Sequence, residues 1–264
     1  PPKAAFQSAR ALLTQLGGLD VAGRATVHGK EMARMGLHPR LAHMALSARE
    51  MGRLRLACEL AGILEERDIL HFPPGEKDAD IRLRIEAVRK GRAFQAKGAS
   101  LNPAALQRIR TQADRWVQML RKGSTGKNRS AGGDDADRDV GTLLALAYPD
   151  RVGQRRSPED LRFQLSGGRG ARFTDFEPLA AEDYIVAAEL DGAGTDARIH
   201  LAAPVRIEDL AAHLPDRFSG SEAIRWNPRT EAVEARFEER FGELVLHHRP
   251  IQKPDPSAVA GAMM

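Results

Sequence analysis

The apolar pattern of this chain changes near Pro149, and the change limits the folds that the chain can adopt. Upstream, apolar residues recur every three or four positions, which is the spacing of amphipathic helices. Downstream, short apolar runs are separated by Gly, Pro and Asp turns: RVGQRR, LRFQLS, ARF, YIVAAEL and RIHLAAPV. Five short strands at this spacing predict a small barrel. We therefore expect an α+β multidomain chain.

Composition places further limits on the class of protein. With 264 residues, 42% of them hydrophobic, the chain can build one large domain or two to three small ones. It has no apolar run of membrane-spanning length, and no signal peptide precedes its first helix. Its single cysteine, Cys58, lies in the apolar run LRLACELAGIL, which predicts a buried thiol in a reducing compartment. We expect an unexported, cytoplasmic protein without a membrane partner.

The stretch MGLHPRLAHMAL contains two histidines that could be metal ligands or parts of a helix. A helix is predicted to begin at Pro39, because the residue before a proline avoids the helical region whereas proline suits the first helical position. Leu41 and Met44 then share the apolar side, and His43 lies on the polar side. A zinc-hydrolase pair needs two histidines four apart on one helical face. His38 and His43 are five apart, and only one is helical, so we predict no metal site.

Further helices are predicted on both sides of a polar linker. Residues 39–70 indicate two helices, the second so apolar that it should be mostly buried. The linker 71–80 is rich in helix breakers, and His71 is predicted to be a loop residue. Asn102 followed by proline is typical of an N-cap, and the long helix that it begins has Trp116 on its apolar, core-facing side.

Charge is distributed unevenly along the chain. Residues 81–129 carry thirteen Lys and Arg against two acids, a net of +11, whereas residues 173–245 carry seven against sixteen, a net of −9. Arg108, Arg115 and Lys122 form a basic stripe on the long helix. A block of this density neutralises phosphates and attracts nucleic acid, although a solvated helix surface can also be basic. We favour the nucleic-acid interpretation.

The segment KGSTGKNRSAGGDDAD, residues 122–137, contains Gly126 and Lys127 and so invites comparison with a phosphate-binding loop. Such a loop also needs a glycine five residues before Gly126 and a Ser or Thr after the lysine, between a strand and a helix. Those positions hold Arg121 and Asn128. We therefore predict a flexible loop rich in Gly, Ser and charge.

Four arginines lie around the first strand of the expected barrel and its glycine turn: Arg155, Arg156, Arg169 and Arg172. Gly167, Gly168 and Gly170 would allow the backbone to approach a phosphate while the flanking arginines supply charge. The alternative is an ordinary hairpin turn with solubilising arginines. Both interpretations stay open at this stage.

Residues 206–264 predict a helix at IEDLAAHL, two strands at EAVEARFEE and ELVLHHRP, and a helix that begins in PDPSAVAGAMM. His247 and His248 are adjacent in the second strand, so their side chains point to opposite faces and make a poor chelate. We predict no catalytic residue and no metal ligand in the chain.

Four stretches resemble the accessory region of bacterial HrpB-type DEAH-box ATP-dependent RNA helicases: HGKEMARMGLHPRLAHMAL, LACELAGILEERDIL, LLALAYPDRVGQRR and SGGRGARF. Their order and spacing agree with that family over nearly the whole chain. The resemblance implies, in chain order, a partial winged helix at 1–36, a helical helicase-associated (ratchet-like) bundle at 37–147, a small β-barrel like the oligonucleotide-binding fold (OB-like) at 148–205, and the truncated start of an HrpB-type C-terminal α/β region at 206–264.

This resemblance implies an accessory nucleic-acid-binding portion of an ATP-dependent RNA helicase, which closes a channel on single-stranded RNA. Its partners would be single-stranded nucleic acid, in this family RNA, and motor domains upstream in the same polypeptide. Those motor domains would bind ATP and Mg²⁺, because phosphoryl transfer needs a lysine, a magnesium-binding acid and an arginine finger. These motifs do not occur in the present residues, so we expect no cofactor and no ATP hydrolysis by this fragment.

Two other functions compete with this interpretation. The chain could be a protein-binding adaptor that recruits a partner through its acidic C-terminal half. It could also be a self-contained hydrolase that uses scattered histidines and acids. The spacing of those residues does not support a hydrolase, so the adaptor is the main alternative.

Overall fold

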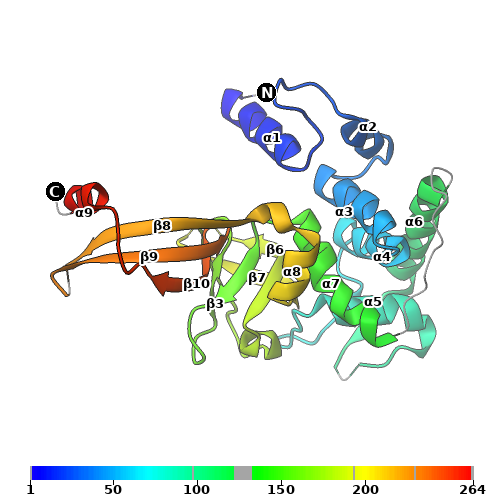
Figure 1. Cartoon of the computed structure of the whole chain (residues 1–264). Coiled ribbons are helices and arrows are strands. Elements are labelled where there is room, and N and C mark those ends of the chain that lie inside the picture. Colours follow the sequence, from blue (N-terminus) through cyan, green and yellow to red (C-terminus); the bar gives the residue numbers. More distant parts are fainter. Residues whose placement is uncertain (1, 97, 122–132, 193, 229, 263–264) are drawn as a thin grey trace.

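The structure, a computed structural model, describes residues 2–96, 98–121, 133–192, 194–228 and 230–262. Within these ranges a helical part, a five-stranded barrel and a three-stranded sheet follow one another along the chain (Figure 1). The fold is therefore mixed α+β, as the change of apolar pattern near Pro149 predicted. None of the described helices is long and apolar enough to cross a membrane.

The helical part consists of helices and one small two-stranded ladder. Its helices are α1 Lys3–Gln15, α2 Val27–Arg34, α3 Pro39–Glu50, α4 Leu54–Glu65, α5 Ile81–Lys90, α6 Pro103–Arg121 and α7 Gly133–Ala147. Strand β1 (Leu70–His71) pairs with β2 (Ser100–Leu101). His71 thus lies in a strand and not in a loop, because its pairing partner comes from far along the chain. A local sequence pattern cannot reveal such a partner.

The helix starts follow from capping residues that the sequence indicated. Helix α3 begins at Pro39, and the ring nitrogen Nδ1 of His38 accepts a hydrogen bond from the Arg40 amide at 3.3 Å. Asn102 Oδ1 accepts from the amides of Ala104 and Ala105, both at 3.1 Å, and so caps α6. Such side chains satisfy amide groups that have no partner inside the helix.

The apolar faces of these helices meet in one core. Leu41 in α3 is 2% exposed and Trp116 in α6 is 4% exposed, as their helical spacing predicted. Cys58 in α4 is fully buried, and burial raises the pKa of its thiol to about 12. The thiol is therefore protonated near neutral pH and unreactive.

The barrel contains the five strands that the alternating runs predicted. They are β3 Val152–Arg155, β4 Arg162–Leu165, β5 Gly170–Arg172, β6 Tyr184–Asp191 and β7 Asp196–Pro204. They close in the order β3-β4-β5-β7-β6, in which β5 and β7 run parallel and the other pairs antiparallel. A short 3₁₀ helix, Pro178–Ala181, joins β5 to β6. Phe163, Ala171 and Ile185 are fully buried inside the barrel.

The barrel packs directly on the helical part. The outer side of β6 and β7 contributes Val186 and Ala203 to the core of the helices. Helix α7 approaches β7 so closely that a Cβ atom on Gly141 would lie 2.0 Å from the carbonyl oxygen of Pro204. Only glycine permits this approach, so α7 and β7 are fixed against each other.

The C-terminal sheet extends away from the barrel, and α9 (Pro256–Ala262) lies near its far end (Figure 1). A short helix, α8 (Ile207–His213), and a 3₁₀ turn, Pro215–Arg217, lead into it. The sheet has the order β10-β9-β8, formed by β8 Phe218–Asn227, β9 Ala232–Phe241 and β10 Leu244–Pro250. The sequence predicted β9 and β10 but not β8, whose first half, FSGSE, lacks an apolar alternation.

Candidate nucleic-acid interface

A segment of the helical part crosses onto the barrel between β1 and α5. We call residues 72–80 the strap. Its end is held to the barrel by two hydrogen bonds: the Ala202 amide donates to the Ala79 carbonyl at 2.8 Å, and the Ala79 amide donates to Glu177 Oε2 at 3.0 Å. The strap therefore holds Lys77 and Asp78 against the outer surface of the barrel.

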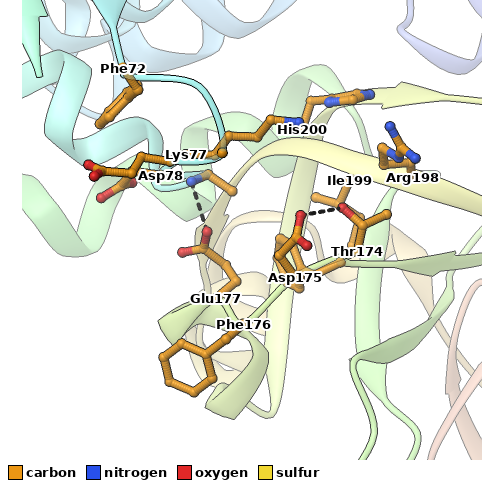
Figure 2. A pocket seen from close by; sticks show the side chains of 14 residues that line it. Phe72, Lys77, Asp78, Thr174, Asp175, Phe176, Glu177, Arg198, Ile199 and His200 are labelled. Carbon is orange, nitrogen blue, oxygen red and sulfur yellow. Dashed lines mark hydrogen bonds between the residues drawn. The ribbon is translucent and has the colours of Figure 1, made fainter. Parts of the chain in front are cut away.

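Cavities that share lining residues run from α6, along the strap, to the barrel. A cavity of about 300 Å³ between the strap and the barrel is lined by Lys77, Arg198 and His200, among others (Figure 2). Lys77 and His200 also line a neighbouring cavity of about 280 Å³, which reaches Glu66. Glu66 in turn borders a cavity of about 720 Å³ beside Arg108 of α6. We call this series of cavities, which are linked by shared lining residues, the junction groove.

At its other end the junction groove reaches β5. Arg198 and Thr174 are shared between the strap cavity and a further cavity of about 360 Å³, which Arg172 also lines. The groove thus has Arg108 at one end and Arg172 at the other. Two of the site residues that the sequence predicted, far apart in the chain, thus line cavities at the two ends of this series.

Three arginines lie side by side on the outer face of the barrel. Arg162 and Arg172 are Cα partners across the β4–β5 pair, and Arg172 and Arg198 are Cα partners across the β5–β7 pair. All three residues are exposed. Partners in a ladder project to the same face, with Cβ atoms roughly 4.5 to 5.5 Å apart in antiparallel pairs. We call this set the arginine row.

The arginine row is only partly neutralised by the chain itself. Asp160 accepts a hydrogen bond from Arg162 at 2.9 Å, and this bond raises the pKa of the guanidinium. The side chain of Arg172 forms neither a hydrogen bond nor an ion pair with any of the residues that the structure describes. Like charges directly opposite each other in a ladder are destabilising, so an anion bound between them would relieve the repulsion.

The remaining predicted site residues have different surroundings. Arg156 donates to Gln164 at 2.9 Å, and Arg169 donates to the carbonyl of Gly194 at 3.2 Å, so both lie near the arginine row. Arg155 instead pairs with Asp183 at 2.7 Å, beside β6. Arg115 is exposed on α6 but does not line the junction groove.

Two further predicted site residues are Lys122 and Arg108. Lys122 and residues 122–132 of the segment compared with a phosphate-binding loop lie outside the described residues, whereas residues 133–137, which were predicted to be loop, form the first part of helix α7. Arg108 is described, and its Nε donates to Glu66 at 2.6 Å, a bond that raises the pKa of Arg108. A phosphate at this position would therefore have to compete with an intramolecular carboxylate.

Residues of the junction groove that the sequence did not reveal come from the strap and from β7. Arg198 and His200 alternate in the run RIHLAAPV, so a strand assignment places both on the outer face. Their position beside Arg172 depends on the parallel β5–β7 pairing, which no local pattern contains. Lys77 and Phe176 come from a linker and a turn, and Phe176 is 90% exposed.

Carboxylates lie beside the cationic side chains of the junction groove and reduce its positive charge. His200 Nε2 lies 2.7 Å from Asp191, and this contact lowers the pKa of Asp191. Burial raises the pKa of Glu177, while its bond from the Ala79 amide acts in the opposite direction. The neighbouring carboxylates of Asp78 and Asp80 raise it further. Glu177 thus links the strap to the barrel at some electrostatic cost.

The histidines of α2 and α3 form a pair away from the groove. Nε2 of His28 lies 2.8 Å from Nδ1 of His43, and the two rings meet edge to face. Burial is the largest cause that lowers the pKa of His43, to about 4. His43 lies on the polar side of α3, as predicted, together with Ser47 and Glu50, but it is only partly exposed because His28 of α2 packs against it. Among the described residues no group of three or more His, Cys, Asp or Glu is arranged to bind a metal.

Comparisons with known proteins find a similarity to one region of a bacterial helicase. No family model matches the chain. Over its whole length the chain is 31% identical to part of the ATP-dependent RNA helicase HrpB of Escherichia coli K12, of which it covers 29%. The expectation of a partial HrpB-type region is thereby confirmed.

Solved structures give the same result. A crystal structure of the E. coli DExH-box NTPase HrpB matches with a TM-score of 0.71 and 28% identity, over 100% of this chain and 29% of that one. A second HrpB structure matches with the same TM-score and coverage at 23% identity, which supports the fold alone. The chain spans less than a third of the proteins that it matches.

Proposed function

We propose that this chain is the accessory, nucleic-acid-binding portion of an ATP-dependent RNA helicase and that it holds single-stranded RNA along the junction groove. The observation that carries the proposal is the arginine row, in which the Arg172 side chain has no hydrogen-bond or ion-pair partner among the described residues and stands between two other arginines. Cations in such an arrangement neutralise backbone phosphates without reading sequence.

The architecture supports the same proposal. A closed five-stranded barrel with the order β3-β4-β5-β7-β6 is what an OB-like fold would have, and such folds bind oligonucleotides on their second and third strands. Here those strands are β4 and β5, which carry Arg162 and Arg172. We assign residues 148–205 to this OB-like barrel and 37–147 to the helicase-associated bundle.

The assignment of the two ends follows the resemblance and is part of the proposal. Residues 1–36 would be the last part of a winged helix, and residues 206–264 would begin an HrpB-type C-terminal region. Motor domains elsewhere in such a helicase would bind ATP and Mg²⁺ and move the RNA. This portion would then close the channel around the strand.

The salt dependence of RNA binding tests the proposal. For single strands, the logarithm of the binding constant falls with the logarithm of salt concentration by about 0.7 per phosphate neutralised. We expect Arg172→Ala to bind a fluorescein-labelled single-stranded RNA more weakly and to reduce this slope by about 0.7. Arg225→Ala, an exposed arginine on β8, should leave both quantities unchanged.

The outcomes separate the two candidate functions. If the wild-type chain binds no single-stranded RNA at low salt, or if Arg225→Ala weakens binding as much as Arg172→Ala does, the proposal is wrong. Binding to a protein partner through the acidic C-terminal half, without any RNA binding, would support the adaptor instead.

A further inference from the structure

The cavity between the strap and the barrel has a different chemical character from the arginine row. Its lining includes four carboxylates, Glu76, Asp78, Asp175 and Glu177, against Lys77, Arg198 and one histidine. Phosphates avoid a site in which carboxylates outnumber the permanent cations. The neutral part of a nucleotide, its base, does not carry this penalty and offers N–H donors to carboxylates.

An exposed aromatic ring lies at the edge of this cavity. Phe176 is 90% exposed, although burying a phenylalanine side chain stabilises a protein by about 1.5 to 3 kcal/mol. Of the other two phenylalanines in the lining, Phe173 is buried, and Phe72 is covered by the guanidinium of Arg84, which lies 5.5 Å from its ring centre. Phe176 is thus the aromatic face that the described cavity lining leaves free for stacking.

Most carboxylates of the cavity already have partners. Glu177 accepts from the Ala79 amide, and Asp78 accepts from the Asp80 amide at 2.8 Å. Asp175, next to Phe176 in the chain, accepts only from its neighbour Thr174, at 3.0 Å. The carboxylate of Glu76 has no hydrogen-bond or ion-pair partner among the described residues, but Asp175 is the weakly engaged carboxylate that lies next to Phe176 in the chain.

The cationic side chains and the exposed aromatic ring lie at opposite sides of the cavity (Figure 2). Lys77 and Arg198 lie toward one side, Phe176 lies at the other, and the carboxylates of Asp175 and Glu177 lie between them. Arg172 precedes Phe176 by only four residues, which limits their Cα separation to roughly 14 Å. One strand of RNA can therefore contact the arginine row with its phosphates and reach Phe176 with a base.

We propose that the strap cavity takes one unstacked base of a single-stranded RNA, which stacks on Phe176 and donates its amino group to the carboxylate of Asp175. Cytosine carries an amino group where uracil carries a carbonyl oxygen, so the site selects cytosine over uracil. The inference rests on the proposed function and adds base selectivity to what would otherwise be a backbone contact.

Fluorescence anisotropy with two labelled RNA dodecamers tests the inference on the whole chain. The probes are an alternating uridine–cytidine strand and an all-uridine strand, neither of which pairs with itself. The wild type should bind the cytidine-containing strand about tenfold more tightly, as expected for one hydrogen bond to a charged group. Asp175→Asn should abolish this preference, because an amide can turn either its oxygen or its NH₂ group toward the base.

Substitution of the aromatic ring gives the second readout. Phe176→Ala should weaken binding of both strands by about five- to a hundredfold, the range for loss of one stacked base. Phe176→Trp keeps a stacking surface and should retain wild-type affinity. Phe6→Ala, which removes an exposed ring on α1 (53% exposed), should have no effect and serves as the matched control.

The results distinguish failure of the base site from failure of the proposed function. If wild-type affinity depends on Arg172 but Phe176→Ala binds as wild type does, or if Asp175→Asn keeps the cytidine preference, the base site is refuted and the proposed function survives. If the wild type binds neither strand, both are refuted.

Discussion

Arg172 and Arg198 are Cα partners in the parallel β5–β7 pair, and both residues are exposed on the outer face of the barrel. Arg162 occupies the corresponding position on the other side of Arg172, in β4. Three adjacent strands thus present the same positive charge at the same level. This arrangement is unfavourable in isolation, and it becomes favourable when a polyanion crosses the strands.

The first prediction concerns the stability of the free protein. Removal of one charge from the arginine row, by Arg172→Ala, should relieve repulsion and raise the free energy of unfolding by about 0.2 to 1 kcal/mol. Arg225→Ala should have the opposite sign, because Arg225 lies across the β8–β9 pair from Glu234, an opposite charge. Urea denaturation of the two variants measures the difference, and equal destabilisation of both would contradict the account.

The second prediction tests the contact between α7 and β7. A Cβ atom at Gly141 would clash with the carbonyl of Pro204, a backbone atom that cannot move aside, so Gly141→Ala should cost about 1 to 3 kcal/mol. Gly261 lies in α9 with no atom within 4 Å of such a Cβ, and Gly261→Ala should stabilise the chain by up to about 1 kcal/mol. Thermal unfolding compares the pair, and a neutral Gly141→Ala would show that the helical part and the barrel are not packed as described.

The third prediction concerns the histidine pair. Folding lowers the pKa of His43 from 6.5 to about 4, so the unfolded chain binds a proton first as the pH falls. The contribution of His43 to stability is therefore complete above pH 6.5 and is lost between pH 6.5 and about 4. His43→Gln, which cannot titrate, should show a shallower decline of unfolding free energy over this range. Parallel curves for the two proteins would contradict the assignment.

Much of the fold follows from short-range patterns. The start of α3 at Pro39 and the cap at Asn102 were predicted because a few adjacent residues determine them. The five barrel strands were predicted because each is a short apolar or alternating run between turns. Strand β8 was missed because its first half carries small and polar residues, and the ring of Phe237 from β9 covers Gly220.

The candidate site was less predictable, because it depends on which strands become neighbours. The alternation of β7 places Arg198 on an outer face, but only the β5–β7 pairing sets it beside Arg172. Charge counting also overstated the basic segment 81–129. Arg84 there is held by Asp68 at 2.7 Å and Arg108 by Glu66 at 2.6 Å, and both acids lie outside the counted segment.

Mapping the path of a bound RNA strand is the most direct test of whether the strap and the barrel hold RNA. A single-stranded RNA that carries photoreactive thiouridines would be cross-linked to the whole chain, and the modified peptides would be mapped by mass spectrometry. We predict cross-links within the strap, residues 72–80, and within residues 162–200 of the barrel, and we predict their loss in Arg172→Ala at moderate salt. Cross-links confined to α1 or to the β8–β10 sheet, or cross-links on the barrel that Arg172→Ala leaves unchanged, would contradict the account.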